Sequence, residues 1–192
     1  MAALLASAFV LFALLGRVFI QYWQTGNHGI RLANPRTEPT ASIAGAVFSG
    51  SFAVSLSVVA LDYFGFWPVK GWAVPYLNEA ALFIGLIGVG IVVNAQLQMG
   101  RAWRIGVDPA EQTQLITYGL YKKSRNPIYF GIALYWLGLA VLLPHPLMWV
   151  LGISCWASIE VIVRRVEEPY LQKLHEQQFI EYKTHTKRYL PI

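Results

Sequence analysis

Five long runs of apolar residues divide this chain, and they constrain its fold more than any other feature. Hydrophobic residues make up 56% of the 192 residues and charged residues only 13%, which is about half of what a soluble domain carries. A helix needs about twenty mainly apolar residues to cross a hydrocarbon core roughly 30 Å thick. The sequence therefore predicts an all-α, polytopic membrane protein with a single domain over residues 1–192. The five predicted spans are 3–23, 42–64, 74–98, 128–143 and 147–163.

The last two predicted spans are short and are separated only by Pro144-His145-Pro146. Proline cannot continue a helix with full hydrogen bonding, so this tripeptide predicts a tight turn and hence a helical hairpin. The polar loop 99–127 precedes the hairpin, and a second polar block follows it. Both polar segments are therefore expected at the same face of the membrane.

Basic residues predict the orientation of the chain. Five spans place the loop 24–41, the loop 99–127 and the C-terminus on one side, and this side is expected to be cytoplasmic because it is rich in Lys and Arg. The N-terminus is then outside, where Lys70 is the one basic residue, and Arg17 lies within the first span. The basic residues on the cytoplasmic side or at its boundary are Arg31, Arg36, Arg101, Arg104, Lys122, Lys123, Arg125, Arg164, Arg165, Lys173, Lys183, Lys187 and Arg188.

Nucleic acids and metal ions are not expected as ligands. The basic residues flank membrane spans and do not gather on a soluble domain, so the net charge of +5 predicts attraction to anionic membrane lipids instead. Cys155 is the single cysteine of the chain and lies within the fifth predicted span. His175 and His185 have no Cys, His or Asp partner at the spacing of a metal site.

The first polar block combines Gly119-Leu120-Tyr121 with Arg125-Asn126-Pro127-Ile128-Tyr129. Glycine permits backbone turns that are closed to other residues, and proline suits the first turn of a helix. Asparagine before that proline is able to cap the helix through its side-chain oxygen. Taken alone, the block is better explained by a capped helix start with interfacial tyrosines.

The second polar block, RRVEEPYL, begins at Arg164. Glu160 and Arg164 are four residues apart and are expected to share a helix face, as are Arg164, Glu167 and Glu168 within one further turn. Ionisable groups at the edge of a span usually face a polar interior, which favours a functional site. The same spacing also suits a ladder of ion pairs within one helix. The spacing of apolar residues over 167–189 then predicts an amphipathic helix that lies along the membrane surface.

Together, the two blocks resemble the family of isoprenylcysteine carboxyl methyltransferases and phospholipid N-methyltransferases, over about residues 100–191. That family has a Leu-Val pair, Gly-x-Tyr, Arg-His-Pro-x-Tyr and a Glu-Glu pair, in this order, before an amphipathic C-terminal helix. The chain departs from the pattern at Asn126, where the family most often has His, and at Thr113, where many members have His. The corresponding elements here are Leu115-Ile116, Gly119-Leu120-Tyr121, Arg125-Asn126-Pro127-Ile128-Tyr129 and Glu167-Glu168.

The resemblance implies a site for S-adenosylmethionine, the methyl donor of these enzymes. By resemblance, Glu167 is the first candidate to hold the amino group of the cofactor and Glu168 the next. Arg164, with Arg165 in reserve, orients an anionic acceptor, and Tyr129 completes the candidate catalytic residues; tyrosine rings also suit a positively charged sulfonium. The cofactor-binding residues implied in this way are Thr113, Gln114, Leu115, Ile116, Gly119, Tyr121, Asn126, Pro127, Ile128, Tyr129, Glu167 and Glu168.

The predicted function is methyl transfer from S-adenosylmethionine to a lipid-like or isoprenoid acceptor at the cytoplasmic face. A carboxylate acceptor is favoured because the sequence offers no evident dedicated base. Two alternatives remain open: an NADPH-dependent membrane reductase of the sterol reductase type, whose C-terminal region looks similar, and a non-enzymatic membrane scaffold. The amphiphilic acceptor is expected to enter from the bilayer between spans, along an apolar groove lined by Tyr129, Tyr135, Trp136, Trp149 and Trp156.

Overall fold

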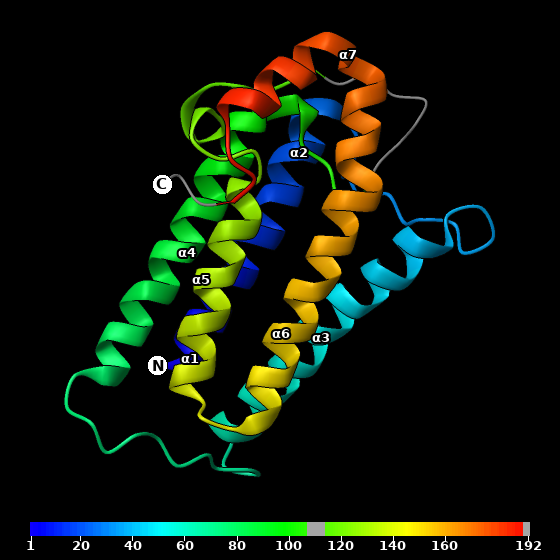
Figure 1. Ribbon diagram of the computed structural model, residues 1–192. Coiled ribbons are helices and arrows are strands. Elements are labelled where there is room, and N and C mark those ends of the chain that lie inside the picture. The colour runs from blue at the N-terminus through cyan, green and yellow to red at the C-terminus, as the bar shows by residue number, and fades with distance from the viewer. Residues whose placement is uncertain (107–113, 190–192) are drawn as a thin grey trace.

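The structure is a computed structural model that describes residues 1–106 and 114–189. Within this part, five helical crossings run alternately up and down, and a further helix caps one end of the bundle (Figure 1). The first crossing joins α1 (Ala2–Ala8), a π-helical stretch (Phe9–Gly16) and α2 (Arg17–Thr25). The others are α3 (Pro39–Tyr63), α4 (Leu77–Met99), α5 (Pro127–Leu142) and α6 (Pro146–Ile162), followed by α7 (Glu168–His185).

The all-α membrane fold predicted from the apolar runs is confirmed. Four helices of the described residues are long and apolar enough to cross a membrane. The remaining crossing, α5, has 16 residues and is about 24 Å long, which is shorter than a hydrocarbon core of roughly 30 Å. The predicted turn between α5 and α6 is also present, where Nδ1 of His145 accepts a hydrogen bond from the backbone N–H of Leu147 (3.2 Å).

The helices pack in pairs, and the closest pair is joined through glycines. A Cβ atom at Gly88 of α4 would lie 2.5 Å from the carbonyl oxygen of Gly131 in α5, and one at Gly131 would lie 2.7 Å from the carbonyl oxygen of Gly88. Small residues let membrane helices approach this closely. In addition, α3 packs along α6, and the first crossing contacts α3, α4 and α5.

An aromatic cluster ties the first crossing to α3 and α5. The ring of Phe9 lies 5.0 Å from that of Phe52 and 4.4 Å from that of Tyr135, and Phe52 also contacts Trp136 at 5.4 Å between ring centroids. Offset and edge-on pairs of this kind are each worth about 0.5–1.5 kcal/mol beyond the area they bury. The centre of the bundle is therefore filled by side chains from three of its helices.

One end of the bundle gathers the loop after α2, the described residues between α4 and α5, and residues 186–189 (Figure 1). The backbone N–H of Arg31 donates to the carbonyl oxygen of Ile105 (2.9 Å), and the N–H of Arg125 donates to that of Lys187 (2.8 Å). These bonds join three segments that are distant in the sequence. They lie at the end that is rich in Lys and Arg, as predicted, while the membrane face that this end meets remains a prediction.

The C-terminal helix departs from its prediction in two ways. First, α6 continues into α7 through a π-helical stretch, Val163–Glu167, with a kink at Glu176 (φ 45°) inside α7. Second, the helix predicted over 167–189 ends at His185, and Thr186 is extended. Residues 186–189, called the C-terminal strap below, leave the helix because their carbonyl groups accept hydrogen bonds from the segment before α5.

Candidate active site

The turn at Gly119 is held by Gln98, which lies in the last turn of α4. The backbone N–H of Leu120 donates to the side-chain Oε1 of Gln98 (2.8 Å). The hydroxyl of Tyr118 donates to the backbone carbonyl oxygen of Gln98 (2.7 Å). Gly119 has φ +60°, and a Cβ there would lie 2.4 Å from the same Oε1. Sequence reasoning missed Gln98, for which an amide at the end of an apolar span is the available signal.

Tyr121 follows this turn and is buried, with 7% of its surface exposed. Its carbonyl oxygen accepts a hydrogen bond from the hydroxyl of Tyr182 (2.6 Å), but its own hydroxyl has no hydrogen-bond partner among the described residues. Burial, and then the nearby charge of Glu167, raise the pKa of Tyr121 well above its ordinary value. The hydroxyl is therefore a neutral donor, and a buried donor without an acceptor is costly unless a ligand or water satisfies it.

Tyr129 and Glu167 meet although 38 residues separate them. The hydroxyl of Tyr129, in the first turn of α5, donates to Oε1 of Glu167 (2.6 Å), which lies at the end of the π-helical stretch. Among the described residues, the hydroxyl of Tyr129 is the group that donates a hydrogen bond to Glu167. Together with Tyr121, the two residues place one carboxylate and two phenol rings at the same end of the bundle, and such a group suits a positively charged ligand.

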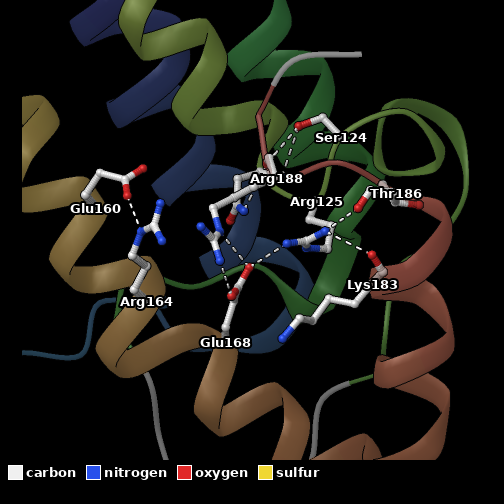
Figure 2. Close-up of polar contacts among 9 residues, drawn as sticks. Ser124, Arg125, Glu160, Arg164, Glu168, Lys183, Thr186 and Arg188 are labelled. Carbon is white, nitrogen blue, oxygen red and sulfur yellow. Dashed lines mark hydrogen bonds and ion pairs between the residues drawn. The ribbon is translucent and has the colours of Figure 1, made fainter. Parts of the chain in front are cut away.

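Glu168, the next residue along the chain, binds two arginines instead (Figure 2). Its Oε1 accepts hydrogen bonds from Arg125 Nη2 (2.9 Å) and Arg188 Nε (2.9 Å), and its Oε2 accepts one from Arg188 Nη2 (2.8 Å). Arg188 thus makes a bidentate ion pair with Glu168, and these hydrogen bonds raise the pKa of its guanidinium. The adjacent glutamates therefore differ: Glu168 is neutralised by arginines, whereas Glu167 contacts a neutral phenol. Burial raises the pKa of Glu167, and the charge of Arg104 acts in the opposite direction.

Arg164 and Arg165, predicted to orient the acceptor, do not join this cluster. The Nε of Arg164 pairs with Glu160, and 56% of the Arg164 side chain is exposed (Figure 2). Arg165 is exposed too. The ion pair predicted between positions 160 and 164 is present, but the face that Arg164 was expected to share with Glu168 is not formed. The reason is the π-helical stretch at 163–167, whose wider turn changes which side chains lie above one another.

Asn126 does not cap α5 through its side-chain oxygen as predicted. Its Nδ2 instead donates to the carbonyl oxygen of Arg188 (3.1 Å), which also accepts from the hydroxyl of Ser124 (3.2 Å). The side chain therefore fixes the C-terminal strap. Pro127 does begin the helix, as predicted, and is buried, while Ile128 is partly buried against the core.

The segment before the Gly119 turn has no regular secondary structure over residues 114–117. Of the residues predicted here, Thr113 lies outside the described part of the chain. Gln114 is exposed, and Leu115 and Ile116 are partly buried. The backbone N–H and C=O groups of residues 114–117 make no hydrogen bond with the described residues. They are therefore available to a ligand that has its own donors and acceptors.

An apolar groove of about 260 Å³ runs between α5 and α6. Trp136, Trp149 and Trp156 line it, as predicted. Tyr129 and Tyr135 do not: Tyr129 contacts Glu167, and Tyr135 belongs to the aromatic cluster in the bundle. The other lining residues are Ile132, Ala133, Leu137, Ala140, Met148, Gly152, Ile153, Cys155 and Ile159.

Comparison with models of known protein families identifies a related family. A family model described as phospholipid methyltransferase matches residues 77–178, which is more than half of the chain. No curated protein matches the chain. The matched segment begins at α4 and ends within α7, and it contains Gln98, Tyr121, Tyr129 and both glutamates of the pair.

Proposed function

The chain belongs to the phospholipid methyltransferase family of integral-membrane methyltransferases, and on this basis we propose that it transfers a methyl group from S-adenosylmethionine to an amphiphilic acceptor. The family resemblance predicted from the sequence is confirmed, and the reductase and scaffold alternatives are not favoured. The observation that supports the cofactor is the meeting of Tyr121, Tyr129 and Glu167 at one end of the bundle.

The residues present fit the charged parts of this cofactor. Glu167 is placed to hold its ammonium group, because Glu168 is already neutralised by two arginines. Among the described residues, the hydroxyl of Tyr121 has no hydrogen-bond partner and offers a buried donor. The backbone groups of residues 114–117, which bond to no described residue, suit the polar edges of adenosine. When bound, the cofactor supplies a methyl group already activated by its sulfonium. The protein then contributes alignment and exclusion of water.

The groove between α5 and α6 supports an acceptor with an apolar tail. Its lining is almost entirely apolar or aromatic, and each methylene group buried there contributes about 0.8 kcal/mol. A long tail would therefore dominate binding, while the head group reaches the polar end of the bundle. We favour a carboxylate head because it needs no base, and a lipid-like or isoprenoid acid is the proposed acceptor class.

Binding of S-adenosylhomocysteine to the purified protein tests the cofactor. A ligand that binds only the folded state raises its apparent stability as the ligand concentration increases, so a rising thermal midpoint is expected. NADPH is expected to give no shift. A shift with NADPH alone would reverse the assignment in favour of a reductase. Transfer of labelled methyl groups into prenylcysteines, aminophospholipids, isoprenoid acids and small thiols then identifies the acceptor, and a product formed only with short soluble acceptors contradicts a groove-bound tail.

The variant Glu167→Gln is expected to weaken binding of S-adenosylhomocysteine about ten- to hundred-fold. The reason is the loss of a charge-assisted hydrogen bond, worth about 1.5–3 kcal/mol, at 1.4 kcal/mol for each factor of ten. Glu160→Gln is the matched control, because Glu160 pairs with the exposed Arg164 on the outer side of the same helix. Titration of the thermal midpoint measures both variants, and equal affinities would contradict the role assigned to Glu167.

The proposed orientation places the basic end of the bundle in the cytoplasm. In a protein with Cys155 replaced by Ser, a cysteine at exposed position Lys122 is expected to react with an impermeant maleimide only from the cytoplasmic side. A cysteine at exposed position Lys70 is expected to react only from the outside. Reaction of both from the same side would contradict the number of crossings, and the reversed pattern would contradict the orientation.

A further inference from the structure

The C-terminal strap joins the polar end of the bundle to the apolar groove. The ring of Tyr189 packs on that of Trp156, which lines the groove, with 4.8 Å between centroids. The preceding residue, Arg188, makes a bidentate ion pair with Glu168. Two consecutive residues of the strap therefore connect the edge of the groove with the cluster beside Glu167.

From this placement we propose that Arg188 binds the anionic head group of the acceptor whose tail occupies the groove. The inference rests on the proposed function and adds a residue to it: the acceptor-binding cation is on the C-terminal strap, not in the π-helical stretch after α6, where the family resemblance implied it. A guanidinium matches the paired oxygens of a carboxylate or a phosphate, and either head group would be recognised by the same chemistry.

The charge balance at Glu168 leaves one positive charge available. Glu168, whose side chain is only 11% exposed, faces both Arg125 and Arg188. The charge of Glu160 also acts on Arg188, but Glu160 is paired with Arg164, so three arginines face two carboxylates here. Arg125 is fixed in place, since its Nη1 also donates to the carbonyl oxygens of Thr186 and Lys183. Arg125 can therefore neutralise Glu168 by itself, which leaves the guanidinium of Arg188 to bind an anion.

Arg188 is also the more accessible of the two arginines. Its side chain is 23% exposed, compared with 10% for Arg125, and its Nη1 makes no hydrogen bond with the described residues. Arg164 is exposed on the other side of this cluster and is neutralised by Glu160 (Figure 2). Among these three arginines, Arg188 combines a free donor with a position next to the groove.

Binding of brominated amphiphiles tests the proposal without the cofactor. Bromine quenches the fluorescence of nearby tryptophans, and three tryptophans line the groove. The probes are 11-bromoundecanoic acid, the alcohol of the same length and the alkyl phosphate of the same length, each titrated into protein in phosphatidylcholine nanodiscs. Arg188→Gln is expected to weaken binding of the acid about ten- to hundred-fold and to leave the alcohol unchanged, because only the acid uses the cation.

Two further variants and the titration of the alkyl phosphate serve as controls for this measurement. Arg165→Gln, at an exposed arginine outside the cluster, is expected to leave all three probes unchanged, and Arg188→Lys is expected to retain part of the preference for the acid. If Arg188→Gln does not fold, Arg188→Lys carries the test through a reduced ratio of acid to alcohol affinity. The alkyl phosphate distinguishes the two head groups, since tighter binding than the acid assigns the site to phosphate.

Two results would overturn the proposal: unchanged binding of both anionic probes in Arg188→Gln, or equal weakening of the acid and the alcohol, which indicates a structural role alone. These outcomes are separate from failure of the proposed function. That failure is seen as no thermal shift with S-adenosylhomocysteine in the unmodified protein, and the probe titration does not depend on it.

Discussion

Glu168→Gln is expected to lower the free energy of unfolding by about 3–5 kcal/mol and to abolish methyl transfer. The substitution leaves Arg125 and Arg188 partly buried beside a neutral amide, and breaking a buried ion pair from one side has costs of this size. It also releases the C-terminal strap from α7, because both side-chain hydrogen bonds of Arg188 are made to Glu168. The thermal midpoint in detergent and the rate of methyl transfer measure the two effects.

Glu160→Gln provides the comparison for that result. Glu160 also pairs with an arginine on the same continuous helix, but its partner is mostly exposed, and such surface pairs contribute about 0–1 kcal/mol. The unfolding midpoint of Glu160→Gln is therefore expected to stay close to that of the unmodified protein. Similar losses in both variants would mean that the arginines at Glu168 are held by other contacts, and that Glu168 is not their main partner.

Gly88→Ala is expected to destabilise the bundle by about 1–3 kcal/mol, whereas Gly90→Ala, two residues away on α4, is expected to be neutral or slightly stabilising. At Gly88 the added methyl group would lie 2.5 Å from a backbone oxygen of α5, which cannot move without shifting the helix. At Gly90 nothing lies within 4 Å, and alanine is the better helix former by about 0.5–1 kcal/mol.

Thermal unfolding of the two alanine variants side by side gives the answer. The pair holds the helix and the chemical change constant, so the difference between the midpoints reports only the contact with α5. If Gly90→Ala is the more damaging variant, then α4 presents a different face to α5 than the structure places there. If both are neutral, α4 and α5 are separated by more than the glycine contacts allow.

The helices could be predicted from the sequence because their signal is local. Each apolar run gives the length and position of a crossing directly, and Pro144 and Pro146 mark the turn between the last two. The end of α7 could not be predicted in the same way. Residues 186–189 are compatible with a helix, and they leave the helix because distant groups at 124–126 bind them: two backbone N–H groups and the hydroxyl of Ser124.

The candidate site was predicted in its composition but not in all its pairings. The motif order indicates Tyr129 and Glu167, and the structure brings these two together. Helical spacing predicted Arg164 beside Glu168, and the π-helical stretch overrides that spacing. Gln98 and Arg188 act through contacts 22 and 20 residues distant in the chain, and no periodic pattern marks contacts of this kind.

The shortness of α5 has a consequence for the bilayer itself. A helix of 16 residues leaves several ångströms of hydrocarbon unmatched, and a membrane adapts to such a mismatch by thinning around the short element. The groove lies along this helix, so the lipids beside its mouth are those whose head groups are drawn inward most. The bilayer thus becomes part of the entrance: its thickness sets how far an amphiphile must leave its own leaflet before its head reaches the basic end of the bundle.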